Sequence, residues 1–291
     1  MMLYAFYIKL LFLLAIAPNY GGLSTEKSSS FFHNDSIKHK VTARKLDLLS
    51  REAFKDGEIL TFKIRYGFIK AGTAKMKVFE DTYNNIPVYH LQTTAKSVST
   101  FNWIYEVNDV VNSYVDYKSF FPIRFEKKLR EGGYRADLFT DYLHSDSLAH
   151  VEFIRYTSDM EIKKRQKYDV SIPAYVQDIL SSFYYIRTQE LEVGRSLFLS
   201  NHEKRKIYDL EIKVLQREII EVEAGKFLCV VVEPVIQGEG LFKKKGNLKI
   251  WLTDDDKKIP VQMKSEVLVG SITTELIKIE GVKELISAQI R

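Results

Sequence analysis

Alternation of apolar and polar residues dominates the chain from Gly57 onward. Leu60, Phe62, Ile64 and Tyr66 alternate with polar residues, which is the pattern of a half-buried β-strand. Further segments with strand character are 74–78, 88–95, 101–115, 123–129, 134–143, 151–156, 197–199, 208–214, 228–232, 248–252, 259–268 and 272–279. Turns rich in Gly, Asn and Asp separate many of them, so the pattern predicts antiparallel strands joined by short connections.

One stretch follows a helical period instead. Its apolar residues recur at intervals of three and four and are Val176, Ile179, Leu180, Phe183 and Ile186. This spacing predicts an amphipathic helix over 176–187, or 174–188 with its flanks, and Ser171 and Pro173 precede it with cap and first-turn chemistry. The charged residues 161–167 are expected to lead into this helix.

Together these elements predict a mostly β fold: an antiparallel curved sheet, sandwich or barrel-like, with one central amphipathic helix. We expect a single β-rich domain over 54–280, or two packed lobes, 54–168 and 195–280, that the helix joins. Residues 228–232 are apolar at every position, which predicts a strand covered on both faces. The tail 281–291 is expected to form a short helix or to fray.

The N-terminal region has a different composition. Lys9 precedes a short apolar run over 10–17, which predicts a signal peptide over 1–22 and an exported protein without a transmembrane span after cleavage. An uncleaved anchor is the alternative, and no lipid anchor is expected because no cysteine follows the run. Residues 23–53 are rich in Ser and Lys and predict a flexible leader.

Composition and charge narrow the classes of partner. Hydrophobic residues make up 45% of the chain, enough for a packed core. The formal charge of +5 is dispersed in short alternations, so nucleic-acid binding is not expected, whereas weak attraction to an anionic membrane surface is compatible with it. The single cysteine, Cys229, can form no intramolecular disulfide and is expected to be a buried thiol.

Candidate catalytic residues are few. The sequence has no Gly-x-Ser-x-Gly elbow and its six histidines are scattered, so we expect no metal or cofactor. Asp254 and Asp255 could act in acid–base chemistry, but a turn between two strands is the commoner role of such residues. Asp178 and Arg187 are nine residues apart and form no helical pair; a structural role is expected for both, with Arg187 bound to a carboxylate or a carbonyl.

Aromatic residues offer a second kind of site. They are Phe183, Tyr184, Tyr185, Trp103, Tyr105 and Trp251. They pack the core, or they line an apolar cavity between the curved sheet and the helix with tyrosine hydroxyls at its mouth.

Several short motifs, in order along the chain, also resemble a known family. They are Gly57-Glu58, the hairpin from Tyr66-Gly67 to Ala71-Gly72, Glu131-Gly132 with Tyr134, residues 178–187 with Tyr184 and Tyr185, Gly225 with Phe227, the run 251–255, and Ile259-Pro260 through Gly270-Ser271. The set, spanning 54–278, resembles the bacterial family of exported domains of unknown function numbered 3108. This resemblance implies an exported, mostly β envelope protein and supplies no catalytic residues.

The sequence therefore favours a non-enzymatic binding module of the bacterial envelope. Its ligand would be an apolar or amphipathic molecule such as a lipid, or a protein partner. The alternatives are a hydrolase that uses Asp254 and Asp255, and a structural scaffold of a cell-surface complex.

Overall fold

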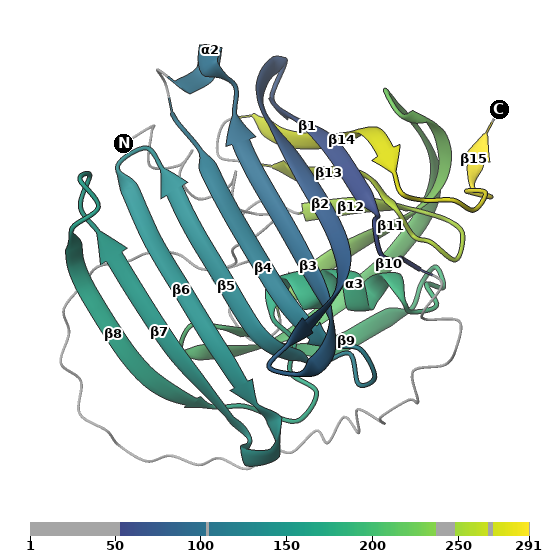
Figure 1. The fold of residues 1–291 in the computed structure, drawn as a ribbon. Coiled ribbons are helices and arrows are strands. Elements are labelled where there is room, and N and C mark those ends of the chain that lie inside the picture. Colours follow the sequence, from purple (N-terminus) through teal and green to yellow (C-terminus); the bar gives the residue numbers. More distant parts are fainter. Residues whose placement is uncertain (1–52, 103–104, 237–247, 267–269, 291) are drawn as a thin grey trace.

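The computed structural model describes residues 53–102, 105–236, 248–266 and 270–290, and within them one antiparallel sheet of 15 strands dominates (Figure 1). The first eight strands are β1 (Ile59–Tyr66), β2 (Ile69–Tyr83), β3 (Ile86–Ser97), β4 (Asn108–Asp116), β5 (Pro122–Glu131), β6 (Tyr134–Leu143), β7 (Leu148–Tyr156) and β8 (Ile162–Ser171). The others are β9 (Ser196–Glu203), β10 (Lys206–Val222), β11 (Gly225–Ile236), β12 (Leu248–Thr253), β13 (Pro260–Glu266), β14 (Ser271–Glu280) and β15 (Gln289–Ile290). The helices are α2 (Ser99–Asn102), the 3-10 turn η3 (His144–Asp146) and α3 (Ile179–Arg187).

The strand order shows how the two ends of the chain join. It runs β8-β7-β6-β5-β4-β3-β2-β1-β14-β13-β12-β11-β10-β9, and β15 pairs with β11. The sequence pattern is compatible with one domain or with two lobes. The pairing of β1 with β14 links the set β1–β8 to the set β9–β14, so the sheet is continuous. This arrangement confirms the mostly β, curved and barrel-like fold expected from the sequence.

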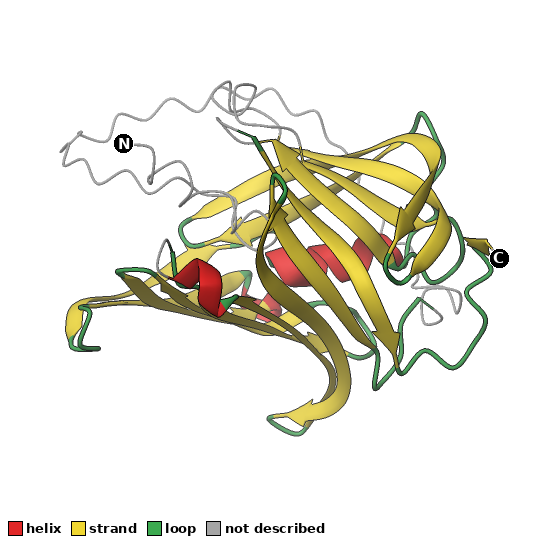
Figure 2. Ribbon diagram, turned by 90° about the horizontal axis from the view of Figure 1, so that it is seen from above, coloured by secondary structure: helices red, strands yellow, loops and turns green. Residues whose placement is uncertain are grey.

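Helix α3 occupies the inside of the curve. It follows β8 and precedes β9, the two ends of the strand order, and lies between the two parts of the sheet (Figure 2). Tyr184 and Arg187 are fully buried, while Phe183 and Tyr185 are half-buried. The main core includes residues of the helix and of the inner faces of both strand sets.

The helix begins later than the sequence pattern predicts. Asp178, and neither Ser171 nor Pro173, is its N-cap, and the helix starts at Ile179. The preceding residue, Gln177, instead forms a parallel bridge with Asn201 of β9. Because Val176 is buried in the core although it precedes the helix, its apolar character extended the predicted helix by one turn.

Three other predicted elements are wrong. Residues 161–167 belong mainly to strand β8 rather than to a helix approach, and the strand predicted over 101–115 begins only at Asn108. The tail contains β15, which pairs with β11 through Gln289 opposite Phe227. Residues 1–52, which include the predicted signal peptide and most of the leader, lie outside the described residues.

A second, smaller core lies on the other face of the sheet. It contains Phe227, Cys229, Val231, Trp251 and Val261. Alternate residues of β11 therefore enter the two cores, which confirms that the apolar run 228–232 is covered on both faces. Cys229 is buried as expected, and burial raises the pKa of its thiol to about 12.

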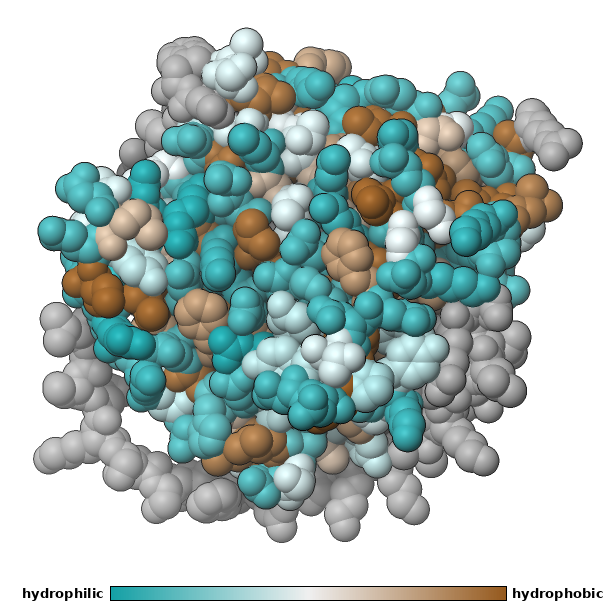
Figure 3. Space-filling view, viewed as in Figure 1, coloured by the Kyte–Doolittle hydropathy of each residue, from teal (hydrophilic) through white to brown (hydrophobic). Residues whose placement is uncertain are grey.

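The outer face seen in Figure 3 is mainly hydrophilic, with hydrophobic residues in small groups. Within the ranges that the structure describes, no helix is long and apolar enough to cross a membrane.

Candidate functional site

Charged residues interrupt the inner face of β4 and β5. In these strands alternate side chains face the core, and the inward positions include Asp109 on β4 and Lys127 and Glu131 on β5. All three are buried, with exposed fractions of 3%, 2% and 2%. Inward positions of a strand normally hold apolar residues. The three buried charged side chains therefore require an explanation.

Asp109 and Glu131, here called the carboxyl pair, lie against each other. The backbone N–H of Arg130 donates to Asp109 Oδ1 at 2.7 Å. Burial first, and then repulsion and hydrogen bonding between the two groups, raise the pKa of Glu131 well above its usual range, and burial also raises the pKa of Asp109. Among the described residues no N–H or hydroxyl donor reaches Glu131 Oε2. The pair therefore retains a proton near neutral pH, and its members titrate together.

A buried ion pair adjoins the carboxyl pair. Lys127 Nζ lies 2.7 Å from Glu203 Oε1, and both side chains are at most 5% exposed. Glu203 ends β9, and the following tip of the β9–β10 hairpin places Lys204 over the ring of Phe153 at 5.4 Å and Arg205 over that of Tyr168 at 3.5 Å. The hairpin therefore covers the inner face of β5 to β8 with cation–π contacts and one ion pair.

His202 fixes the same hairpin from the other side of β9. Its Nε2 lies 2.7 Å from the carbonyl oxygen of Lys204, so this nitrogen is the donor. Burial lowers the pKa of His202, so the ring is neutral and Nδ1 accepts from the hydroxyl of Tyr142 at 3.2 Å.

The start of α3 forms a second polar cluster, which we call the helix-cap cluster: Asp178, Ser113, Ser181, Ser182 and Asn201. Asp178 Oδ1 accepts the backbone N–H groups of Leu180 and Ser181, and Oδ2 accepts the Ser113 hydroxyl at 2.6 Å. Asn201 Nδ2 donates to the Ser182 hydroxyl, which donates to the Asp178 carbonyl. The cap thus ties the helix to β4 and β9.

Burial also acts on the Asp178 carboxyl. It raises the pKa of Asp178 to about 6, although the hydrogen bonds from Ser113, Ser181 and Leu180 favour the ionised form. Asp178 therefore combines a capping carboxyl with complete burial.

Arg187 closes the other end of the helix. Its two terminal nitrogens donate to the Glu58 carboxylate at 2.6 and 2.8 Å, and further N–H groups reach the carbonyls of Ala53 and Lys257. The guanidinium also lies over the ring of Tyr184 at 5.1 Å. These are the carboxylate and carbonyl contacts that the sequence predicts for Arg187.

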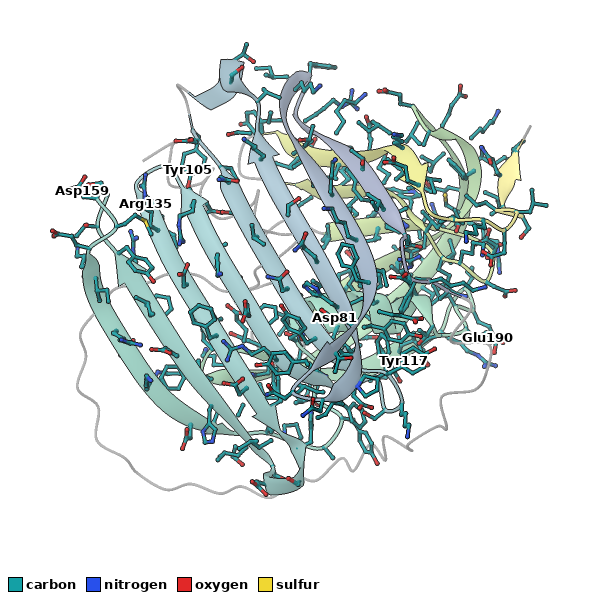
Figure 4. All side chains as sticks on the ribbon, in the orientation of Figure 1. Asp81, Tyr105, Tyr117, Arg135, Asp159 and Glu190 are labelled. Atoms are coloured by element: carbon teal, nitrogen blue, oxygen red, sulfur yellow. The ribbon has the colours of Figure 1, made fainter. Side chains whose placement is uncertain are left out.

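The structure brings together only some of the six aromatic residues proposed from the sequence. Phe183, Tyr184 and Tyr185 share α3, whereas Tyr105 packs beside Gly132 at the β5–β6 turn, near Arg135 and away from Tyr117 in Figure 4. Trp103 lies outside the described residues.

Trp251 lies on the face of the sheet opposite to α3, so it cannot line a cavity together with the aromatic residues of the helix. Its neighbours Ile250 and Leu252 point into the main core, so alternation turns Trp251 into the second core, where its Nε1 donates to Glu218 at 2.7 Å.

The aspartates after β12 have the contacts of a turn. Asp254 pairs with Arg217, and Asp255 Oδ1 accepts from the Thr253 hydroxyl and from the backbone N–H groups of Lys257 and Lys258. No group of three His, Cys, Asp or Glu side chains among the described residues is placed to hold a metal ion.

The sequence patterns did not single out the carboxyl pair or Lys127. A signal was present, because Lys127 and Glu131 occupy the same alternate positions as Phe125 and Leu129 in β5. A charged residue in the inward series of an amphipathic strand identifies such a group, provided that the inward face is assigned correctly.

A curved antiparallel sheet around one buried helix defines an all-β, barrel-like protein, and a solved structure shares this fold. A β-barrel-like protein of domain of unknown function DUF1849 from Brucella abortus superposes with a TM-score of 0.52 at 9% identity, covering 77% of this chain and 97% of that one.

By sequence, the chain belongs to the family described as "Protein of unknown function (DUF3108)", which matches residues 61–277. Two further solved structures have TM-scores of 0.33: a candidate exported protein with a YmcC-like fold from Bacteroides fragilis, at 9% identity and covering 77% of this chain and 96% of that one, and a candidate lipoprotein from Parabacteroides distasonis, at 12% identity and covering 77% and 95%. No curated protein matches the sequence significantly.

Proposed function

We propose that this protein is an exported bacterial envelope protein that binds an amphipathic, lipid-like molecule at the inner face of its curved sheet, without catalysing a reaction on it. The observation that carries the proposal is the carboxyl pair, Asp109 and Glu131, buried on a face that is otherwise mainly apolar. The predicted signal peptide over 1–22 supports the location in the envelope.

Unsatisfied polar atoms support a ligand with a hydrogen-bonding headgroup. Glu131 Oε2 lacks an N–H or hydroxyl donor among the described residues, and Thr93 Oγ1 lacks any hydrogen-bond partner there. Thr93 pairs with Val111, which in turn pairs with Lys127, so Thr93 lies across β4 from the buried Lys127, and Glu131 follows four residues along β5. A buried unpaired polar atom costs about 1–3 kcal/mol, which a ligand hydroxyl or amide would recover.

The residues around the pair suit the apolar part of such a molecule. Ala95 pairs with Asp109 and with Ala74, and Ala136 pairs with Leu129, so the adjoining inward positions carry apolar side chains, most of them small. Phe183 of α3, which is only half-buried, is the aromatic residue from the sequence-based proposal that we assign to contact with the apolar chain, because Tyr185 points to nearly the opposite side of the helix.

The protonation state of the carboxyl pair determines which kind of lipid headgroup we expect to bind. Because the pair holds a proton, it offers both a donor and acceptors to an uncharged polar group. A ligand carboxylate would instead lie beside Asp109 and Glu131, where a further negative charge is unfavourable. We therefore expect a monoacylglycerol to bind more tightly than a fatty acid of the same chain length.

Competition with a fluorescent apolar probe tests this order. Purified protein is loaded with N-phenyl-1-naphthylamine, and a monoacylglycerol or the matching fatty acid is titrated at pH 7. We expect monoacylglycerol to displace the probe at lower concentration. The Glu131→Leu/Thr93→Val variant should lose that preference, because it removes the polar atoms without opening a large void.

The matched control is Lys128→Gln, because Lys128 is exposed on the opposite face of β5. Native mass spectrometry of protein purified from bacterial envelopes should also show a retained amphipathic molecule. Failure of both lipids to displace the probe, together with a ligand-free native mass, would overturn the proposal.

A further inference from the structure

Basic residues form a row across the outer face of five neighbouring strands. Lys70 on β2 pairs with Arg65 on β1, which pairs with Thr273 on β14. Thr273 pairs with Lys264 on β13, and Lys264 pairs with Lys249 on β12. Directly paired residues point to the same side of a sheet, so these four cations, here called the basic row, share one face over four strand spacings of roughly 4.8 Å, or roughly 19 Å.

Acidic residues leave most of this charge uncompensated. Lys70, Lys249 and Lys264 are exposed, and within the described ranges none of the three makes an ion pair. Arg65 pairs with Glu275, which also lies 3.9 Å from Lys63 in the adjacent row. The basic row therefore presents three free ammonium groups to solvent.

An exposed apolar tip adjoins one end of the row. The β1–β2 hairpin turns at Gly67, whose φ of 55° suits glycine, and the next two residues are Phe68 and Ile69. Phe68 is fully exposed and Ile69 is 57% exposed, and Lys70 follows immediately. Water-exposed hairpin tips usually carry Gly, Asn or Asp, so an aromatic and a β-branched residue here are unfavourable in water alone.

We propose that this surface docks the protein onto an anionic lipid bilayer, with Phe68 and Ile69 entering the headgroup region and the basic row facing the lipid phosphates. Amphipathic surfaces bind membranes through the sum of buried apolar area and attraction to anionic lipids, and both parts are present here. A nucleic acid would account for the lysines but not for an apolar tip that projects fully into solvent.

Vesicle co-sedimentation tests the docking. The full mature chain is mixed with vesicles of phosphatidylcholine containing 30% phosphatidylglycerol, and with vesicles of phosphatidylcholine alone. We expect binding to the anionic vesicles that weakens as salt is raised, because screening shortens the reach of the charges. The neutral vesicles should bind at least roughly tenfold less protein, since each lysine near an anionic surface contributes roughly fivefold.

Two variants measure separately how much the basic row and the apolar tip contribute to vesicle binding. Lys249→Glu/Lys264→Glu should lower binding to anionic vesicles more than roughly tenfold. Phe68→Ser/Ile69→Ser should lower it several-fold and make the remainder more sensitive to salt. The matched control is Lys163→Glu/Lys164→Glu, which makes the same charge change at exposed positions of β8, an end strand of the sheet. Circular dichroism confirms that each variant is folded.

Equal binding to both kinds of vesicle, no binding to either, or equal losses in the control and the Lys249→Glu/Lys264→Glu variant would overturn the proposal. So would salt-sensitive binding to a DNA oligonucleotide or an acidic peptide without binding to anionic vesicles. The result is independent of the inner-face ligand, because Phe68→Ser/Ile69→Ser should leave displacement of the fluorescent probe by monoacylglycerol unchanged.

Discussion

At the scale of single residues, the interior is unusual for its buried charges, and Arg187 is the largest fully buried side chain in the part of the chain that the structure describes. Its guanidinium is bound by the Glu58 carboxylate and by two backbone carbonyls, that of Ala53 before β1 and that of Lys257 between β12 and β13. The residue therefore joins the helix to the segment before β1 and to the β12–β13 connection through charge-assisted hydrogen bonds.

Removing one partner of this ion pair should cost more than removing both. Arg187→Met leaves Glu58 as a buried, uncompensated carboxylate, and we expect a loss of about 3–5 kcal/mol in the free energy of unfolding. The double variant Glu58→Met/Arg187→Met should recover part of that loss because no charge stays buried. Urea unfolding of the two single variants and the double variant gives the coupling free energy between Glu58 and Arg187. A double variant that is no more stable than Arg187→Met alone would contradict this account.

The raised pKa of Glu131 predicts how the free energy of unfolding depends on pH. Its folded pKa is raised above the ordinary value of 4.5, so the stability it contributes is fully present below pH 4.5 and is lost as pH rises toward the folded pKa. Glu131→Gln has the shape of the protonated side chain but does not titrate. We expect the wild type to lose stability relative to Glu131→Gln between pH 5 and 8, by about 1–3 kcal/mol. Urea unfolding at several pH values measures the difference, and a difference independent of pH would show that Glu131 is not held protonated.

At the scale of elements, the N-cap decides where α3 begins and what it contacts. Asp178→Ala removes the acceptor of three hydrogen bonds and leaves the Ser113 hydroxyl without this partner, so we expect a loss of about 2–4 kcal/mol. Asp178→Asn can still cap the helix and should cost less. Thermal and urea unfolding check this order, and equal losses for Ala and Asn would contradict the capping role.

The same carboxyl gives a second pH window. Because its folded pKa is raised from 3.8 to about 6, its contribution to stability is full below about pH 3.8 and is lost as pH rises through about 6. The wild type should therefore fall in stability relative to Asp178→Asn between pH 4 and 6.5. This window lies below neutral pH, which distinguishes it from the Glu131 effect that continues above it.

Sequence patterns predicted elements with strong local periodicity and missed those defined by distant partners. The alternation in β1 and the apolar run in β11 correspond to strands with the expected burial. Strand β8 has charged residues over most of its length and pairs only with β7, so it lacked the apolar alternation that identifies a strand. The start of α3 was misplaced because Val176 is buried for tertiary reasons.

The candidate site was predicted less well, for a related physical reason. Arg187 could be assigned a buried carboxylate or carbonyl partner because a charged residue on a packed helix requires one, but the identity of Glu58 depends on a contact 129 residues away. Asp109 and Glu131 are separated in sequence and meet only through the pairing of β4 with β5. The face to which Trp251 belongs likewise depends on which side of the sheet the helix covers.

At the scale of the whole molecule, the pairing of β1 with β14 joins the first strands of the domain to the last. Phe62 pairs with Leu276 at this seam, and both are fully buried. The core cluster that contains them also contains residues of α3 and of the inner face of both strand sets. A sheet that is continuous in hydrogen bonding and shares one core should unfold in a single cooperative step.

Unfolding followed by two signals tests whether the strand sets behave as one unit or as two lobes. In a Trp103→Phe background, fluorescence reports only Trp251 in β12, while amide hydrogen exchange reports β3 to β6 separately. We expect coincident transitions, and Leu276→Ala should shift both by about 2–5 kcal/mol because it leaves a cavity at the seam. Ile219→Ala, at an exposed position of β10, is the control and should leave them nearly unchanged. If Leu276→Ala instead shifts the Trp251 transition while β3 to β6 keep their protection, the seam does not couple the two sets and the chain folds as two lobes.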